Sequence, residues 1–218
     1  MAIKSISLNR KITSYGKVQV AISNIIRSKG LFINRKRIRD LRLLNIGCGE
    51  HVYPQFVNLD YFWRPGINIC LDITKKGYPL PDNSMEGVYT EHCLEHIPLS
   101  AGEKNLKEMY RVLKPGGTVR IVVPDGELYF TLYNKKLNGE RVAMPYEEEY
   151  ITPIARINSL FRSYGHQFIY DFETFRLLLE RTGFKDIRKE KYMTGRNREL
   201  LIDTEERQIE SLYVEASK

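Results

Sequence analysis

From residue 41 onward, short hydrophobic runs alternate with segments in which hydrophobic residues recur at helical spacing. This alternation predicts strands joined by helices, and therefore an α/β sheet. The strands expected first are 41–47, 56–60, 67–72, 85–91 and 118–124, and two more are expected within 184–193 and 211–216. All of them would belong to one domain, residues 41–218.

Two helices of this domain have recognisable ends. The first is expected near 100–113, because a Lys-Pro-Gly-Gly sequence at 114–117 ends its hydrophobic periodicity and turns into the next strand. Asp171 is expected to cap the second helix, and Gly183 stands at its end, where a left-handed residue is common.

Residues 1–40 are predicted to form a basic arm before this domain. Residues 1–42 carry a formal charge of +10, whereas the rest of the chain carries −3. Within the arm, 15–28 is expected to form an amphipathic helix, whose hydrophobic stripe consists of Val18, Ala21, Ile22 and Ile25. We expect this stripe to pack on the domain; an anionic membrane surface and nucleic acid are the alternative partners of such a basic helix.

Composition excludes several other classes of protein. The 218 residues are 42% hydrophobic and 11% aromatic, which allows one substantial core and excludes a disordered chain. No run approaches the roughly 18 apolar residues of a membrane span, and the first residues lack the apolar core of a signal peptide, so a cytoplasmic protein is expected. Cys48, Cys70 and Cys93 form no C-x-x-C pair and are expected to be reduced thiols.

Polar residues and glycines at the strand ends indicate a ligand site. Gly47 and Gly49 follow the first strand and would let a ligand approach the backbone. A dinucleotide is disfavoured, because Val52 stands where the third glycine of that fingerprint belongs. Asp60 ends the second strand and could accept hydrogen bonds from a ribose, and Asp72 ends the third and could accept one from an adenine amino group. Either aspartate could instead cap a turn.

The motifs LNIGCGE, VNLD, LDITKKGYPLPDNSMEGVYTEHCLEHIP, LKEMYRVLKPGGTVRIVVPD and HQFIYDFETFRLLLERTGF occur in that order. Over residues 41 to about 190, the chain resembles the class I S-adenosylmethionine (SAM)-dependent methyltransferases of the type 11 group. The resemblance implies a Rossmann-like fold, with a doubly wound, mostly parallel seven-stranded sheet and a reversed last strand. It also implies that SAM is bound by Gly47, Gly49, Asp60, Asp72, Ile73, Glu91 and His92. The short segment 50–55 departs from the family pattern, which usually has a longer crossover there.

The segment TEHCLEHIP, residues 90–98, concentrates polar chemistry after the fourth strand. As a helix it would place His92, Glu95 and His96 on one face. The H-x-x-E-H of inverted zinc peptidases matches these letters, but the preceding strand and the following proline argue against that class. Three interpretations stay open: a polar first turn, direct base catalysis, or a divalent cation held together with His166. The cation is implied by resemblance to the small-RNA 3′-end and quinone O-methyltransferases, and histidine ligands would favour zinc, manganese or iron over magnesium.

Methyl transfer needs in-line positioning and a deprotonated acceptor. For an alcohol acceptor, a base near neutrality or a metal-bound alkoxide is required. His96 and His166 are the expected catalytic residues, and Asp125, after the fifth strand, is the reserve candidate.

Residues 126–165 are rich in aromatic side chains and are expected to form the acceptor pocket, where they could stack on a sugar or a base. These aromatic residues are Tyr129, Phe130, Tyr133, Tyr146, Tyr150, Phe161 and Tyr164. The expected activity is O-methylation of a saccharide or sugar-linked metabolite. The alternatives are an RNA-end methyltransferase and a non-catalytic cofactor-binding domain that acts as an interaction partner.

Overall fold

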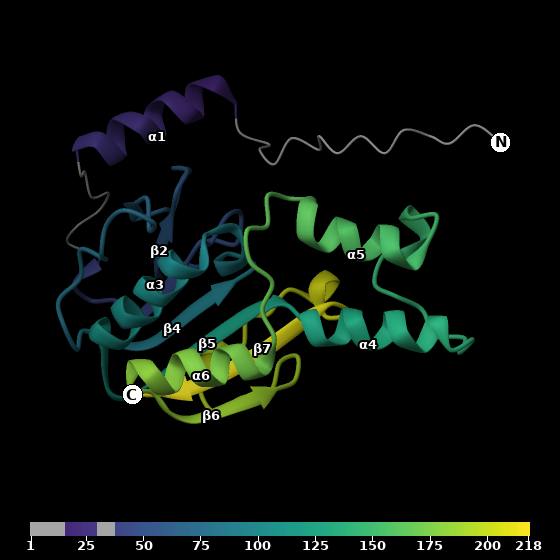
Figure 1. Cartoon of the computed structure of the whole chain (residues 1–218). Coiled ribbons are helices and arrows are strands. Elements are labelled where there is room, and N and C mark those ends of the chain that lie inside the picture. The colour runs from purple at the N-terminus through teal and green to yellow at the C-terminus, as the bar shows by residue number, and fades with distance from the viewer. Residues whose placement is uncertain (1–15, 30–37) are drawn as a thin grey trace.

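A computed structural model describes residues 16–29 and 38–218 (Figure 1). Its centre is a seven-stranded sheet in the order β3-β2-β1-β4-β5-β7-β6. The strands are β1 Leu43–Ile46, β2 Phe56–Asp60, β3 Ile69–Cys70, β4 Met85–Glu91, β5 Leu113–Pro124, β6 Lys185–Glu190 and β7 Ser211–Ser217. Among the described strands, β7 alone runs in the opposite direction to the others. The predicted doubly wound, mostly parallel sheet is confirmed, and its strand order reverses between β1 and β4.

The predicted strands 56–60 and 85–91 are confirmed at both ends. The strand expected at 67–72 is shorter, because only Ile69 and Cys70 pair with β2. β5 begins earlier than expected, at Leu113, and contains the Lys-Pro-Gly-Gly sequence. Its register against β4 shifts there, and Gly116 has a φ of 79° that favours glycine.

The connection from β1 to β2 contains turns and no helix. Buried asparagine side chains hold it in place: Asn45 donates to the backbone oxygen of His51 at 2.9 Å, and Asn58 donates to that of Tyr53 at 2.8 Å. These bonds satisfy backbone groups that a crossover helix would satisfy internally. A short parallel connection is thereby stable without the usual helix.

Two helices cover one face of the sheet (Figure 1): α3, Leu99–Val112, and α6, Phe172–Thr182. Both match the predicted helices. The side chain of Asp171 accepts a hydrogen bond from the backbone of Thr174 at 2.8 Å, and Gly183 ends α6 with a φ of 105°. The hydrophobic sides of these helices pack on the central strands and form the main core.

Residues 191–210 form a segment without an α-helix or a strand, which packs on the opposite face of the sheet. It contains the short 3-10 turns η3, Arg198–Leu200, and η4, Glu205–Arg207. Leu200 packs into a second core formed by side chains of β1, β2, β4, β5 and β7. Arg120 of β5 is fully buried and pairs with Asp203 of this segment at 2.5 Å. Burial and ion pairing together hold this long segment against the sheet.

Beyond the carboxyl end of β5, α4, Gly126–Leu137, and α5, Pro153–Arg162, pack against each other (Figure 1). The 3-10 turn η2, Glu147–Glu149, lies between them in the chain. The two helices share a small separate core of Tyr129, Met144, Ile157 and Leu160. The aromatic-rich region 126–165 thus forms an annex at the edge of the sheet where the strands end.

The helix predicted at 15–28 is present as α1, Lys17–Lys29. The expectation that its hydrophobic stripe packs on the domain is wrong, because Val18, Ala21, Ile22 and Ile25 are exposed. Ser23 and Ile26 are buried instead. Residues 1–15 and 30–37 of the predicted arm lie outside the described residues. Among the described helices, none is both long enough and apolar enough to cross a bilayer.

Candidate functional site

Three adjacent cavities open at the carboxyl ends of the parallel strands. The β2–β3 cavity, of about 550 Å³, is lined by residues that follow those two strands, among them Asp60, Asp72 and Ile73. The β1 cavity, of about 320 Å³, contains Gly47, Gly49 and Glu91 in its lining. The α5 cavity, of about 620 Å³, lies between the annex and the end of β4. Ligands of doubly wound sheets bind at this edge, beside the reversal of strand order.

Gly47 and Gly49 shape the backbone between the first two cavities. Both have a left-handed φ, of 65° and 52°. A Cβ on Gly47 would lie 2.3 Å from the Sγ of Cys93, so a larger residue cannot be accommodated without displacing that side chain. The backbone N–H of Gly49 donates to Oδ2 of Asp60 at 2.8 Å. The turn after β1 therefore positions the carboxylate at the end of β2.

Asp60 is buried at the wall of the β2–β3 cavity. Its Oδ1 accepts a hydrogen bond from the backbone of Phe62 at 2.8 Å. Burial raises the pKa of this carboxyl, and the hydrogen bonds from Phe62 and Gly49 act in the opposite direction. A carboxylate offers about four lone-pair positions, so Asp60 retains acceptor capacity for a hydroxyl of a ligand.

Glu91 ends β4 and lines the β1 cavity. Its Oε1 and Oε2 accept hydrogen bonds from the backbone and hydroxyl of Thr204, at 3.0 and 2.5 Å. These bonds attach the segment 191–210 to the sheet. They also bring Arg207, three residues further along the chain, to the boundary between the β1 and α5 cavities.

His92 is the residue that lines all three cavities. The predicted common helical face for His92, Glu95 and His96 is wrong, because His92 has a left-handed φ of 46° and the following helix is only the 3-10 turn η1, Leu94–His96. The His92 ring still lies near the others, with Nδ1 3.4 Å from Oε1 of Glu95. Its Nε2 is 2.9 Å from the hydroxyl of Ser211.

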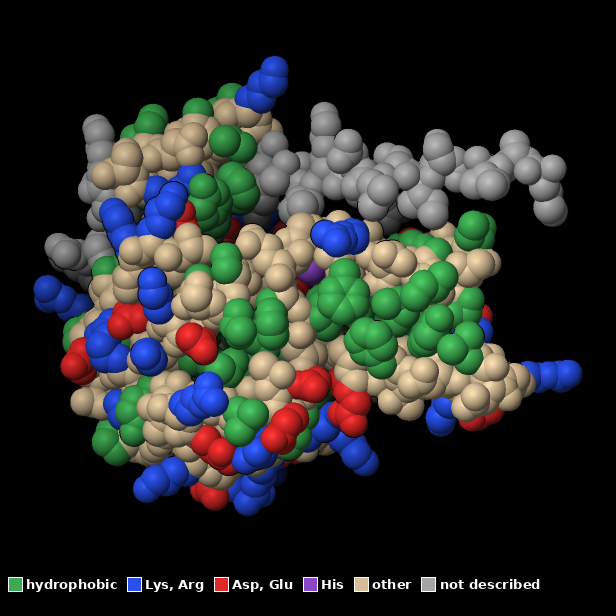
Figure 2. Space-filling view, viewed as in Figure 1, with side chains coloured by type: hydrophobic (Ala, Val, Ile, Leu, Met, Phe, Trp, Pro, Cys, Tyr) green, Lys and Arg blue, Asp and Glu red, His purple; other side chains and the backbone are tan. Residues whose placement is uncertain are grey.

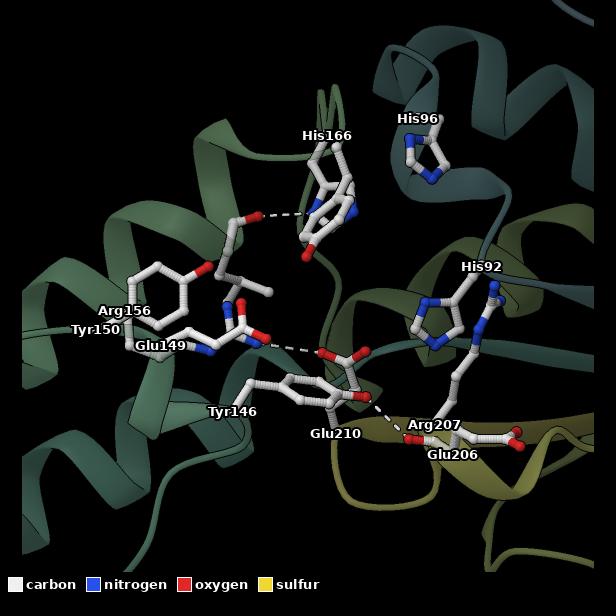
Figure 3. A pocket seen from close by; sticks show the side chains of 12 residues that line it. His92, His96, Tyr146, Glu149, Tyr150, Arg156, His166, Glu206, Arg207 and Glu210 are labelled. Atoms are coloured by element: carbon white, nitrogen blue, oxygen red, sulfur yellow. Dashed lines mark hydrogen bonds and ion pairs between the residues drawn. The ribbon is translucent and has the colours of Figure 1, made fainter. Parts of the chain in front are cut away.

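His96 and His166 face each other in the α5 cavity, with ring centroids 4.9 Å apart (Figure 3). Nδ1 of His166 lies 2.7 Å from the backbone oxygen of Leu160, so this nitrogen carries the proton and Nε2 is free to accept one. Burial lowers the pKa of His96 to about 4, and the nearby His166 acts in the same direction. Burial also lowers the pKa of His166. Both rings are therefore neutral at pH 7, although burial makes each a weaker base than a free imidazole.

Glu95 is completely buried beneath these histidines, and within the described part of the chain neither of its carboxyl oxygens accepts a hydrogen bond. Burial raises the pKa of Glu95 to about 8. Ligand atoms of Glu95, His96 and His166 all lie within 4.8 Å of one another. Two imidazoles and one buried carboxyl group form a donor set suited to zinc, manganese or iron, and His92 is not part of this group. A divalent cation at this position stays a prediction.

Replacing Glu95 with glutamine should change how stability depends on pH. In the wild type, the folded state retains a proton up to about pH 8 that the unfolded state releases near pH 4.5, so stability falls as pH rises through this interval. Below pH 6.5 the histidines oppose this slope, because their folded-state pKa values are lowered. Between pH 6.5 and 8, the free energy of unfolding should therefore fall by about 2 kcal/mol in the wild type.

Urea titrations at several pH values between 6.5 and 8 measure this slope, and they should show little slope for Glu95→Gln, which has no ionisable group at this position. Glu140→Gln, a change at an exposed position, is the matched control and should retain the wild-type slope. Equal slopes in the wild type and Glu95→Gln would contradict a protonated Glu95.

The structure does not bring Asp125 to the two histidines. Its side chain caps α4 by accepting from the backbone of Leu128 at 3.3 Å, and it pairs with Lys189 at 3.2 Å. Asp125 lines none of the three cavities. The base role predicted for it therefore has no geometric support, because its carboxylate is engaged by the backbone of Leu128 and by Lys189.

Three of the predicted aromatic residues line the α5 cavity: Tyr146, Tyr150 and Tyr164. Tyr129 is buried behind it, where its hydroxyl donates to Glu210 at 2.6 Å. Arg156, Glu206, Arg207 and Glu210 also line this cavity and were not predicted (Figure 3). No local motif marks these residues, since they reach the cavity from α5 and from the segment before β7.

The residues present fit SAM. Asp60 would hold the ribose, while Asp72 and Ile73 would lie beside the adenine. The backbone around Gly47 and Gly49, with Glu91 and Arg207 nearby, would hold the amino-acid portion. His92 joins these two regions and would lie near the sulfur.

Residues 21–189 match a family model described as "Methyltransferase domain". The chain belongs to this family and is a SAM-dependent methyltransferase of the class I, Rossmann-like fold. SAM is thus its cofactor.

Individual relatives agree with this fold. A SAM-dependent methyltransferase of Archaeoglobus fulgidus is 16% identical, with a TM-score of 0.50 over 92% of this chain and 94% of that one. One of Thermotoga maritima is 18% identical, with a TM-score of 0.51 over 81% and 82% of the two chains. Phosphoethanolamine N-methyltransferase 2 of Caenorhabditis elegans is 30% identical over 126 residues, which are 58% of this chain but only 23% of that protein.

Asp60→Ala is expected to weaken SAM binding by about 1.5–3 kcal/mol, or roughly 10- to 150-fold in dissociation constant, because hydrogen bonds to a charged group are lost. Isothermal titration calorimetry measures this. Asp186→Asn, at an exposed position on β6, is the control and should bind normally. An unchanged dissociation constant for Asp60→Ala would mean that another residue holds the ribose.

Proposed function

We propose that this methyltransferase acts on a hydroxyl oxygen of a saccharide or of a sugar-linked metabolite. The observation that carries the proposal is the position of His92 at the junction of all three cavities. With the cofactor held across the β2–β3 and β1 cavities, the α5 cavity is left for the acceptor. The two reactants would then meet beside His92.

The lining of the α5 cavity supports a hydroxyl-rich acceptor. The rings of Tyr146, Tyr150 and Tyr164 offer faces on which a sugar can stack. Arg207 and Glu206 add a hydrogen-bond donor and an acceptor. An acceptor of this kind needs both apolar faces and several polar partners, and this cavity supplies both.

The histidines support proton removal from that hydroxyl. The bound cofactor supplies a methyl group that is already activated, so the protein contributes positioning and a proton acceptor. His96 and His166 are neutral and lie in the α5 cavity, and Nε2 of His166 has its lone pair available. The backbone oxygen of Leu160 orients the His166 ring, as a second group commonly does for a catalytic base.

Transfer to an amine nitrogen is the second candidate. The 30% identity to a phosphoethanolamine N-methyltransferase favours it. Glu149, Glu206 and Glu210 line the α5 cavity, and their carboxylates would attract an ammonium group. These three carboxylates outnumber the two arginines of the same lining, Arg156 and Arg207, which disfavours the polyanionic end of an RNA as acceptor.

The test is incubation of the purified protein with methyl-labelled SAM and separate pools of soluble sugars, lipid-linked sugars, small amines including phosphoethanolamine, and RNA. Label recovered as an O-methyl sugar after product hydrolysis is the expected result. Label on an amine nitrogen would replace the proposal with the second candidate, and label in RNA alone would contradict both. Asp60→Ala is the control and should show much weaker labelling of every pool.

A further inference from the structure

Helix α1 docks on the catalytic domain through the side that carries Gln19, Ser23 and Ile26. The side chain of Gln19 donates to the backbone oxygen of Trp63 at 2.9 Å, and the backbone of Trp63 donates to the Ser23 hydroxyl at 2.8 Å. The Arg27 guanidinium lies 3.7 Å from the centre of the Tyr61 ring. These contacts, with Ser23 fully buried, set which side of the helix faces outward.

The outward side is apolar, which reverses the usual arrangement of a surface helix. Val18, Ile22 and Ile25 are 74%, 37% and 53% exposed, and Ala21 lies exposed between them in the chain. Their spacing of three and four residues aligns them in one stripe along the helix. Figure 2 shows hydrophobic side chains along the outer edge of α1. Within the described part of the chain, nothing covers this stripe.

The positive charge near the stripe favours an anionic partner. Helix α1 contains no acidic residue, and Lys17 is exposed next to Val18 at the start of the stripe. By sequence, residues 1–42 carry +10, against −3 for the remainder. A helix with an apolar stripe and a basic flank is suited to the interface of an anionic bilayer, where the apolar side chains enter the acyl boundary and the cations meet acidic headgroups.

Position in the fold links this stripe to the methyl-transfer site. Arg27 stacks on Tyr61, and Tyr61 and Phe62 line the β2–β3 cavity. Tyr164, which lines the α5 cavity, also lines the β2–β3 cavity. A surface bound by α1 would therefore lie close to the end of the sheet where cofactor and acceptor bind.

We propose that the exposed stripe of α1, Val18, Ala21, Ile22 and Ile25, is a docking surface for anionic membrane, which holds the methyltransferase at the lipid surface as a peripheral protein. The hydrophobic stripe supplies insertion, and the basic flank supplies selectivity for acidic lipid. This inference does not depend on which acceptor is methylated.

The test is co-sedimentation of the full chain with two kinds of vesicle. One is pure phosphatidylcholine, and in the other about a quarter of the lipid is phosphatidylserine. We expect binding to the anionic vesicles at low salt and release as salt rises, because the Debye length shortens from about 30 Å at 0.01 M to about 10 Å at 0.1 M. The triple variant Val18→Gln, Ile22→Gln, Ile25→Gln should lower the partition coefficient by roughly 10- to 100-fold, because the inserted aliphatic groups are lost.

A matched control removes three exposed aliphatic side chains elsewhere: Leu137→Gln, Leu177→Gln, Ile209→Gln. It should bind vesicles like the wild type. Retained thermal stabilisation by S-adenosylhomocysteine would show that each variant is folded. Equal vesicle binding by both triple variants would overturn the proposal. Absence of vesicle binding by the wild type would also overturn it. The stripe would then have another role, such as a dimer contact, seen as concentration-dependent light scattering, or salt-sensitive binding to RNA.

Discussion

His96→Ala and His166→Ala are each expected to lower the turnover of methyl transfer by roughly 10²- to 10⁴-fold, the usual contribution of a positioned proton acceptor. The loss should shrink as pH rises, since solvent then deprotonates the acceptor. Because the pKa of His96 is about 4, the wild-type rate should not fall through protonation of this ring until the pH approaches that value. Initial rates with saturating SAM across pH 5–9 provide the measurement.

Asp125→Asn is the matched control for these two substitutions. Asparagine can still cap α4, and position 125 lies outside the three cavities, so turnover should stay at the wild-type level. A large loss in Asp125→Asn would restore the catalytic role that the sequence suggested. Unchanged rates in both histidine variants would show that the cluster is structural.

A chelator separates the two chemical roles left open for the cluster. If Glu95, His96 and His166 hold a divalent cation, chelation should abolish wild-type turnover while SAM binding persists, and His166→Ala should lower both metal affinity and rate. If the histidines act as bases, chelation should change nothing. Metal analysis of the purified protein, compared with Glu95→Gln, gives a readout that does not depend on activity.

Arg120→Met is expected to destabilise the protein by about 3–5 kcal/mol. The Arg120 guanidinium is fully buried, with Nη2 2.5 Å from Asp203 and Nη1 2.9 Å from Glu215. It also donates to the backbone oxygens of Lys191 and Thr194. Its loss would leave two buried carboxylates without their cation, which costs far more than the ion pairs contribute. Urea unfolding at pH 7 measures the change.

Arg176→Met is the control for this prediction, because Arg176 forms comparable ion pairs with Glu173 and Glu180 on the solvent side of α6. Its unfolding midpoint should stay close to the wild type. Adding Asp203→Asn and Glu215→Gln to Arg120→Met should recover part of the lost stability. An Arg120→Met midpoint equal to that of the control would contradict the account.

Loss of Arg120 would also affect the candidate site. Asp203 immediately precedes Thr204, whose bonds to Glu91 fix the course of the chain toward Arg207. Loosening Asp203 should therefore disturb the boundary between the β1 and α5 cavities. We expect residual folded Arg120→Met to bind SAM more weakly than wild type.

Sequence periodicity determined most of the fold. Strands such as 56–60 are buried along their whole length, so their hydrophobic runs stand out from the turns around them. The helix from Asp171 to Gly183 was predictable because its cap and its left-handed end depend on single residues. The ends of the short β3 were less predictable, because pairing with β2 and not local composition sets them.

The cofactor half of the candidate site was also accessible from sequence, because Gly47, Gly49, Asp60 and Asp72 stand at or just after the ends of strands that meet at one edge. The acceptor half was not. Its residues come from α5, η2 and the segment before β7, and no spacing in the chain connects them.

What the sequence by itself determined is therefore the order of strands and helices and the residues at strand ends, since both follow from local periodicity and backbone preference. Tertiary structure alone decided the rest. It gave His92 a left-handed backbone conformation, which excludes this residue from a helix. It also placed Arg207 near His92 through the contacts of Asp203 with Arg120 and of Thr204 with Glu91. Tertiary structure also directed the apolar stripe of α1 outward, because the hydrogen bonds of Gln19 and Ser23 with Trp63 hold the other side of that helix against the domain. Such long-range contacts produce no periodic pattern in the amino-acid sequence.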